Sequence, residues 1–258
     1  MGRIHQFPVT AETLLLTFLP YHTEPLYARL LQIISLPPIF SFLEQYTNIR
    51  VSATLPPVPR QHFIRALSRD PTFLEKYSTF LVSCVHSGHG FSAQIVTWTT
   101  LLVEAILQMR QARTSDEDIV QRIMPFVAQA LQMKTSLEFQ IAGYTVLTIL
   151  ASNGTLTTKV VDAAMEAVVL GWTEQSRRYG LLCLVTLAQS RDGEVVLTES
   201  VVQSLLSLEY VLSLDRLISG TWCHKLKRYL QKRRSEYFLY PSPKRFLLWR
   251  NSGIIRTF

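Results

Sequence analysis

The sequence predicts an all-α protein built as a solenoid of stacked antiparallel helix pairs. Helix start and stop signals recur along most of the 258 residues, whereas runs that alternate apolar and polar residues, as strands do, are nearly absent. Hydrophobic residues make up 48% of the chain and charged residues only 17%, so the chain can bury a sizeable core. Alternate predicted helices also begin at a nearly constant interval, which is typical of repeats that stack on one another.

The first 69 residues predict an irregular N-terminal region. Pro20 separates the first two predicted helices, and Pro37-Pro38 precede the third. A loop with three prolines then leads into a fourth, short helix. The helices are predicted over residues 10–19, 24–35, 39–46 and 60–68, and the loop over residues 51–59.

From Asp70 onward the helix signals are more regular. Asp70-Pro71 combines an N-cap residue with proline at the first helical position. Ser115 and Ser136 are also predicted to be N-caps, and the acids that follow Ser115 suit the helix dipole. The helix after Ser115 has an apolar stripe at i, i+4 spacing: Ile119, Ile123, Val127 and Leu131. The other predicted helices span residues 70–87, 92–113, 136–153, 173–190, 198–207 and 215–234, with one more from Thr157 or Thr158 to about residue 171.

Alternate helix starts at residues 70, 116, 157 and 198 are separated by 46, 41 and 41 residues. Helix pairs with a period of about 40–47 residues are typical of HEAT and armadillo repeats, whereas tetratricopeptide and ankyrin repeats are shorter, at about 33–34 residues. We therefore predict a HEAT/armadillo-like helical-repeat solenoid over residues 70–223. Residues 224–258 are predicted to be a basic, aromatic tail that is partly disordered.

The net charge of +7 is unevenly distributed. Residues 224–258 hold ten of the 26 Lys and Arg and a single acid, Glu236, which gives about +9 there and about −2 in the rest of the chain. Such a tail can bind nucleic acid or an acidic protein surface, or it can be a solvated end without a partner. Both interpretations stay open at this point.

The cysteine pattern and the uncharged stretches favour a reducing compartment and no membrane span. Cys84, Cys183 and Cys223 have no disulfide-framework spacing, and the first two are predicted to be buried free thiols. Residues 78–103 lack charge, but the Ser87-Gly88-His89-Gly90 turn predicts two separate helices instead of one span.

No catalytic motif stands out in the sequence. It has no Gly-x-Ser-x-Gly elbow and no phosphate-binding glycine loop. The spacing of Cys84, His86 and His89 is not that of a standard structural zinc site, even when His62 is added. These residues are predicted to lie at the ordinary end of a helix and in the turn after it. Asp116, Glu117 and Asp118 lie in the first turn of a predicted helix, where negative charges are favourable next to the positive end of the helix dipole. This explains the cluster of carboxylates without acid/base catalysis. We therefore expect no enzyme activity, no cofactor, no metal and no small-molecule substrate.

The basic tail is the one candidate site with a chemical signal. Lys225, Arg228 and Lys232 are three and four residues apart and share one face of the last predicted helix. Such a face can neutralise phosphates, and aromatic residues beyond it can stack on bases; the same side chains can also lie over an apolar groove. The candidate contacts to RNA or an acidic partner are Lys225, Lys227, Arg228, Lys232, Arg233, Arg234, Lys244 and Arg245.

Several segments resemble one protein family. Arg3-Ile4-His5-Gln6-Phe7 and LLLTFLPYHT at residues 14–23 carry the most specific likeness, and IMPFV at 123–127, GYTVLTILAS at 143–152 and LDRLISGTW at 214–222 follow in the same order. They resemble the N-terminal region of the large HEAT-repeat protein called U3 small nucleolar RNA-associated protein 10, especially its fungal members. Members of that family are several times longer, and the likeness ends near Trp222.

The resemblance implies a non-catalytic scaffold of ribosome biogenesis. Its setting would be the nucleolar small-subunit processome, the early 90S pre-ribosome, with roles in pre-rRNA processing and rDNA transcription. Other processome proteins are the expected partners, pre-rRNA is a further candidate, and no membrane is expected. The alternative is an importin/armadillo-type protein-binding adaptor. We rank it lower because Trp98, Trp172 and Trp222 do not recur at the repeat period.

Overall fold

A computed structural model of the chain describes residues 7–47, 56–190, 197–206, 228 and 231, with side chains from residue 11 onward. These residues form helices, turns and loops, and no strand occurs among them. The chain divides into two compact units, Met1–Ser190 and Arg191–Phe258. The predicted all-α fold is confirmed. The predicted domain boundaries after residues 69 and 223 stay predictions.

The first unit opens with short helices that include two 3₁₀ segments. These are α1 (Phe7–Phe18), η1 (Leu19–Tyr21), α2 (Pro25–Ile33), η2 (Pro38–Tyr46) and α3 (Arg60–Arg69). Prolines at the first or second position of η1, α2 and η2 explain the frequent breaks, since proline has no N–H and ends the preceding helix. Aromatic rings hold this region together: Phe42 meets both Phe63 and Phe73 edge-on at centroid distances of 5.8 and 5.1 Å.

The regular part of the first unit consists of six longer helices. They are α4 (Pro71–His86), α5 (Ser92–Gln111), α6 (Asp116–Gln132), α7 (Leu137–Asn153), α8 (Thr158–Gly171) and α9 (Arg177–Gln189). In the second unit, α10 spans Glu199–Leu206. The helices α4, α6, α8 and α10 begin at residues 71, 116, 158 and 199, which are 45, 42 and 41 residues apart. The predicted repeat period is therefore confirmed.

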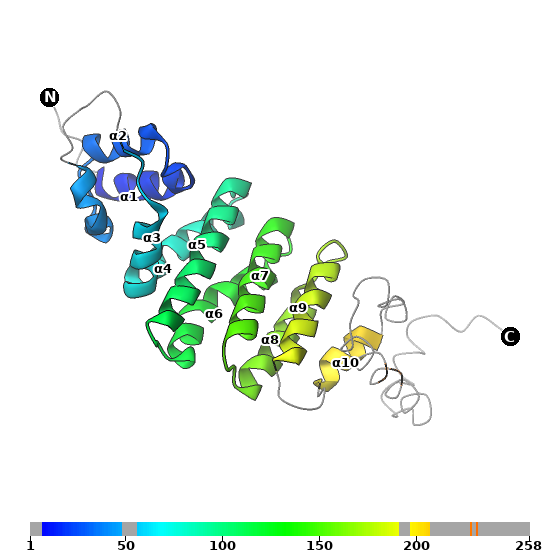
Figure 1. The fold of residues 1–258 in the computed structure, drawn as a ribbon. Helices are drawn as coiled ribbons and strands as arrows, with labels where there is room; N and C mark the ends of the chain where they lie inside the picture. Colours follow the sequence, from blue (N-terminus) through cyan, green and yellow to red (C-terminus); the bar gives the residue numbers. More distant parts are fainter. Residues whose placement is uncertain (1–6, 48–55, 191–196, 207–227, 229–230, 232–258) are drawn as a thin grey trace. The chain divides into compact units, whose positions relative to one another are not determined.

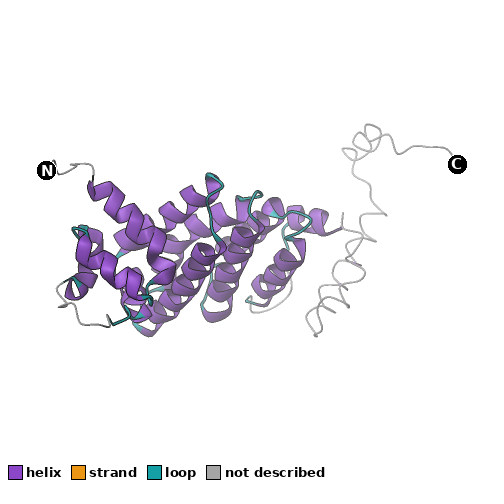
Figure 2. Cartoon of the chain, turned by 90° about the horizontal axis from the view of Figure 1, so that it is seen from above, coloured by secondary structure: helices purple, strands orange, loops and turns teal. Residues whose placement is uncertain are grey.

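Helices of the first unit pack in two layers (Figures 1 and 2). In one layer α3 packs on α5, α5 on α7 and α7 on α9, and in the other α4 packs on α6 and α6 on α8. Apolar faces meet between the layers. The stripe predicted on α6 is fully buried there, with Ile119, Ile123, Val127 and Leu131 all at 0% exposure. Each helix pair thus buries its apolar surface partly on its neighbours, as a solenoid requires.

All three predicted caps are present. Asp70 accepts the backbone N–H of Thr72 at 2.8 Å, and Ser115 accepts that of Asp118 at 3.1 Å. Ser136 accepts that of Phe139 at 3.3 Å. These bonds satisfy amide groups that a helix N-terminus leaves unpaired.

The helix α5 begins at Ser92, as predicted, and the Ser92 hydroxyl donates to the Glu138 carboxylate of α7 at 2.5 Å. Two other sequence-based predictions need correction. The helix predicted from residue 173 begins at Arg177, because Thr173 and Ser176 exchange side-chain bonds with each other's backbone N–H groups in a preceding turn. Cys183 is buried as expected, but Cys84 is only half-buried.

Candidate binding surfaces

Two polar contacts tie consecutive repeats together. The first is made by Gln140 of α7, whose side chain is fully buried. Its Nε2 donates to the carbonyl oxygen of Leu131 at 3.2 Å and to that of Gly171 at 2.9 Å. Leu131 lies near the C-terminus of α6 and Gly171 ends α8, where carbonyls lack partners within the helix. Gln140 therefore holds the ends of two helices from different repeats.

Gly171 makes this close approach sterically feasible. A Cβ added at residue 171 would lie 2.1 Å from the carbonyl oxygen of Leu131, well inside van der Waals contact. Only glycine therefore lets α8 end this close to α6 without a backbone shift.

The second contact joins α5, α6 and the end of α7. The guanidinium of Arg110 donates to the carbonyl oxygens of Ile149 and Leu150 at 3.3 and 2.9 Å and pairs with Asp116 at 3.3 Å. The other carboxylate oxygen of Asp116 accepts the N–H and the hydroxyl of Thr155 at 2.8 and 2.9 Å. Burial acts to raise the pKa of Asp116, but the bonds from Thr155 and Arg110 outweigh it and hold that pKa below its ordinary value.

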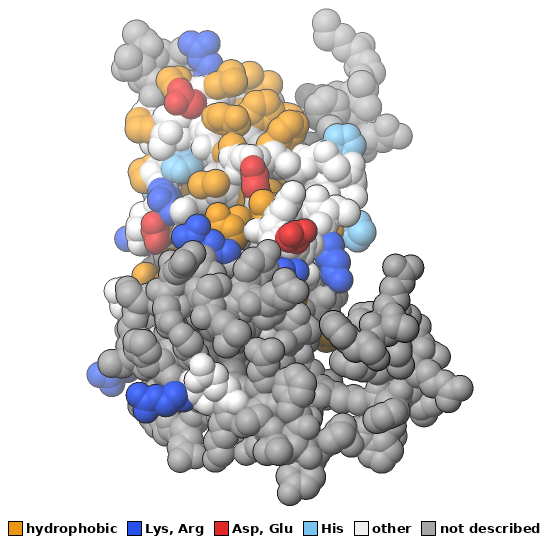
Figure 3. Space-filling model, turned by 90° about the vertical axis from the view of Figure 1, so that its right-hand side faces the viewer, with side chains coloured by type: hydrophobic (Ala, Val, Ile, Leu, Met, Phe, Trp, Pro, Cys, Tyr) orange, Lys and Arg blue, Asp and Glu red, His pale blue; other side chains and the backbone are white. Residues whose placement is uncertain are grey.

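With the repeats fixed in this way, the outward faces of the helices are the surfaces that a partner can reach. Three large aliphatic side chains are exposed on α5, α7 and α9: Val96 and Leu107 on α5 and Leu182 on α9. Threonine hydroxyls there donate within their own helices, Thr100 to the carbonyl of Val96 and Thr145 to that of Ile141. Hydrophobic side chains also gather in the upper part of the face drawn in Figure 3. Surfaces of this kind suit protein partners better than nucleic acid.

The predicted basic site lies almost entirely outside the described residues. Of its eight side chains only Arg228 is described, and it is helical and exposed. The remaining seven, Lys225, Lys227, Lys232, Arg233, Arg234, Lys244 and Arg245, stay predictions.

The histidines and cysteines singled out in the sequence do not form a cluster. Across residues 7–47, 56–190 and 197–206 no group of three His, Cys, Asp or Glu side chains is placed to hold a metal ion. Cys84 is half-buried, while His86 and His89 are exposed. His62 lies instead against Tyr46, with its Nε2 3.1 Å from the phenolic oxygen.

No single helix among the described residues is both long and apolar enough to cross a bilayer. One bent pair, Pro25–Ile33 with Pro38–Tyr46, meets the length and composition test only when the two are taken together across a 114° bend.

The two-layered stack of helix pairs, with alternate helices beginning 41–45 residues apart, places the chain in the class of helical-repeat proteins. Residues 119–241 match the family model of U3 small nucleolar RNA-associated protein 10. Proteins of that name from Aspergillus oryzae and Neurospora crassa are 31% and 32% identical over 80% and 82% of this chain, and one from Coccidioides immitis is 29% identical over 85%. The chain belongs to the U3 small nucleolar RNA-associated protein 10 family, as the sequence blocks indicated. It spans about 12% of the length of these relatives.

Proposed function

We propose that this chain is a non-catalytic scaffold segment of ribosome biogenesis. In this proposal it acts in the nucleus, within the nucleolar small-subunit processome or 90S pre-ribosome, and serves pre-rRNA processing and rDNA transcription. Its partners are other processome proteins and pre-rRNA. The observation that carries the proposal is family membership, since the matched relatives bear a name that associates them with a small nucleolar RNA.

The fold supports a scaffold function on physical grounds. Helical solenoids present extended surfaces along which other chains can bind. The contacts of Gln140 and Arg110 fix the geometry between repeats, so that a partner meets a preformed surface and loses less conformational entropy on binding.

The basic tail supports contact with RNA. The segment 224–258 has a net charge of about +9, and lysine and arginine side chains that neutralise phosphates release counterions and so favour binding. Tyr237, Phe238, Phe246 and Trp249 provide aromatic rings for stacking on unpaired bases. We assign the RNA-contacting function to the eight basic residues named above.

Affinity purification of the tagged full-length protein from its own cells, with analysis of both protein and RNA, tests the scaffold function. Parallel purifications of this chain and of a version of it that ends at Trp222 test the tail. Recovery of processome proteins and pre-rRNA is the expected result, with RNA reduced in the shortened version. Recovery of transport cargo in their place would support the importin-type alternative and contradict the proposal.

The RNA contact has a quantitative test with a matched control. We expect a Lys225→Ala/Arg228→Ala/Lys232→Ala variant to bind single-stranded pre-rRNA less tightly. Its slope of log affinity against log salt is expected to be shallower by about 2, at about 0.7 for each lost phosphate contact. A control with Arg65→Ala/Lys134→Ala/Lys159→Ala removes three exposed cations from the first unit and is expected to leave the slope unchanged. Equal slopes in all three proteins would refute the assignment.

A further inference from the structure

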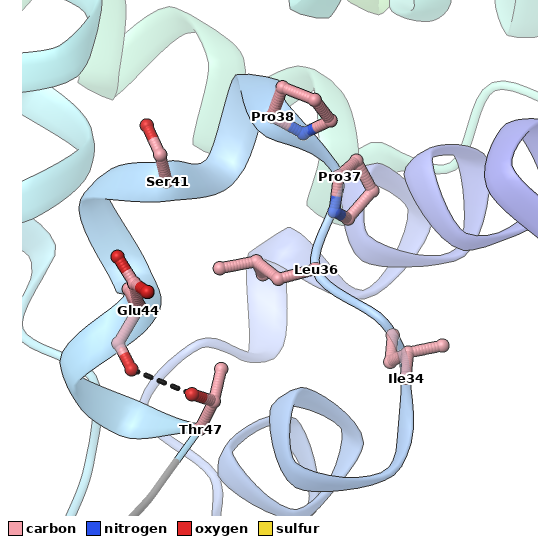
Figure 4. A pocket seen from close by; sticks show the side chains of 7 residues that line it. All are labelled: Ile34, Leu36, Pro37, Pro38, Ser41, Glu44 and Thr47. Atoms are coloured by element: carbon pink, nitrogen blue, oxygen red, sulfur yellow. Dashed lines mark hydrogen bonds between the residues drawn. The ribbon is translucent and has the colours of Figure 1, made fainter.

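The first unit contains two proline segments near its N-terminal end, and they are held in different ways. Pro37-Pro38 leads directly into η2, where the carbonyl oxygen of Pro37 accepts the N–H of Phe40 at 2.9 Å (Figure 4). The helix that this segment starts therefore fixes it. The second segment, Pro-Pro-Val-Pro at residues 56–59, leads into α3, and its first three residues lie outside any helix. They need a different anchor.

His22 provides that anchor by pairing with Val58 in both directions. The N–H of Val58 donates to the carbonyl oxygen of His22 at 3.1 Å, and Nδ1 of His22 donates to the carbonyl oxygen of Val58 at 2.7 Å. Because proline has no N–H, Val58 is the only residue of the segment that can donate a backbone hydrogen bond. One residue, 36 positions earlier in the chain, therefore takes both its donor and its acceptor.

The pair is shielded from water. Val58 is fully buried, and His22 is buried in the turn that follows η1. The His22 ring lies against the ring of Phe63 on α3, with centroids 5.2 Å apart. Breaking buried hydrogen bonds without replacing them is costly, so a neutral ring holds the segment in place. A charged ring in the same position would be poorly hydrated, and burying such a charge is unfavourable.

The charges around His22 do not compensate a positive ring. The described titratable and charged groups on the elements around it are Glu12 on α1, Tyr21 on η1, Glu24, Tyr27 and Arg29 at α2, Arg60, His62, Arg65 and Arg69 on α3, and Glu104 and Arg110 on α5. None of the described carboxylates forms an ion pair with the ring. Arg60 repels a charge on His22, although it also pairs with Glu104 at 2.7 Å. Burial is the main reason why the pKa of His22 is lowered; the Val58 carbonyl opposes it and Arg60 adds to it.

We propose that His22 is a proton-operated latch on the proline segment that leads into α3. With a neutral ring the latch is closed, and Val58 holds the segment against the turn between η1 and α2. When a proton from solvent binds Nε2, the latch opens, because the charged ring is better hydrated outside this site. The inference concerns a local conformational change and does not depend on the proposed scaffold function.

Hydrogen exchange at the amide of Val58 measures the opening in the whole 258-residue chain. A fragment that spans residues 56–59 retains deuterium at Val58 alone, since proline has no amide hydrogen. The protection factor of this amide, which is its intrinsic exchange rate divided by the observed rate, is expected to be constant above about pH 6.5. Below that pH it is expected to fall by up to about tenfold for each pH unit, until the ring of the closed state is protonated as well.

The control amide is that of Trp172, which donates to the carbonyl oxygen of Val168 at 3.1 Å at the end of α8. It lies in a repeat that does not include His22, so its protection factor should not change over the same pH range. An equal fall at Val58 and Trp172 would show that acid loosens the whole chain, and this would overturn a local latch.

Two variants separate the effect of the proton from that of the hydrogen bond. Asparagine places an amide nitrogen near the position of Nδ1 but does not titrate, so we expect His22→Asn to keep most of the protection of Val58 at about pH 7.5 and to lose its pH dependence. His22→Ala removes the donor and is expected to lower the protection about tenfold at every pH, as for the loss of one buried hydrogen bond. Circular dichroism of both variants reports on folding.

His62→Gln is the matched control, because His62 is a half-buried histidine on α3 whose ring contacts Tyr46 and not Val58. This variant should keep the pH dependence of Val58. A protection factor at Val58 that stayed constant from about pH 8 to pH 5 would overturn the latch, as would a pH dependence that persisted in His22→Asn. A fall at Val58 alone, lost in His22→Asn and kept in His62→Gln, is the result that establishes it.

Discussion

The side-chain Nε2 of Gln140 lies 2.9 Å from the carbonyl oxygen of Gly171, across the boundary between two repeats. The same nitrogen reaches the carbonyl of Leu131, so one amide from α7 satisfies the C-terminal ends of α6 and α8. Buried carbonyls without a partner are costly, and a glycine at residue 171 is what lets the two backbones come close enough to share one donor. The stacking of these repeats therefore depends on a polar contact as well as on apolar burial.

Replacing Gln140 with leucine is expected to lower the free energy of unfolding by about 2–3 kcal/mol, because two buried carbonyls lose their donor while a side chain of similar volume is retained. Urea unfolding followed by circular dichroism measures the change. Gln129→Leu on the exposed side of α6 is the matched control and should alter stability by no more than about 0.5 kcal/mol. A similar effect in both variants would contradict a specific role for the Gln140 contact.

Gly171→Ala is expected to destabilise the chain although alanine is the better helix former. The added Cβ would lie 2.1 Å from the Leu131 carbonyl oxygen, so α8 must shift and the Gln140 bond to residue 171 must lengthen. We expect a loss of about 2 kcal/mol in the same unfolding measurement, as for other overpacked sites. Gly180→Ala is the control, since its nearest neighbours are side-chain atoms at 3.2 Å and beyond, and its effect should be smaller.

The sequence was informative where structure depends on neighbours along the chain. The caps at Asp70 and Ser115 and the stripe from Ile119 to Leu131 are local patterns, and each predicted its element. The family was also predictable, because residues 3–23 form a specific block.

Contacts between repeats were not predictable in this way. Gln140 looks like any polar residue in a helix, and its partner Gly171 is 31 positions away. The exposed side of α2 gave no signal either, because an apolar residue is equally compatible with a core and with an exposed surface; the structure shows that Ile33 is exposed. Of the basic residues predicted as a site, Arg228 alone is among those described.

Asp116→Asn is expected to remove about 1 kcal/mol of stability at neutral pH by weakening the pair with Arg110 and the bonds from Thr155. Because the folded-state pKa of Asp116 is lowered, the contribution of its charge is complete above the ordinary carboxyl pKa of about 3.9 and is lost as the pH falls through the lower folded value. The difference between wild type and variant should therefore be constant from about pH 7 to pH 5 and shrink below about pH 4.

Urea midpoints measured between pH 3 and pH 7 check this profile. Asp118→Asn replaces a neighbouring exposed carboxylate in the first turn of the same helix and provides the comparison, with an expected loss of no more than about 0.5 kcal/mol from the helix dipole. A stability difference for Asp116→Asn that stayed constant through pH 3 would show that the charge of Asp116 has no part in the contact.

His22 links stability to pH in a different range. The residue is 7% exposed, and its Nδ1 lies 2.7 Å from the carbonyl oxygen of Val58, so the neutral ring donates from Nδ1. Burial lowers the pKa of His22; the Val58 carbonyl opposes this, and the positive charge of Arg60 adds to it. Because the folded-state pKa is lowered, the unfolded chain binds more protons, and the stability present above about pH 6.5 must decrease as the pH falls through the folded value.

We expect the His22→Gln variant to be less stable than wild type by about 1 kcal/mol at pH 8, and its stability to change less between pH 8 and pH 5. Equilibrium unfolding across that range measures both features, and His86→Gln, which removes an exposed imidazole from the end of α4, should keep the wild-type profile. If His22→Gln kept that profile as well, the buried ring would not be the source of the pH dependence.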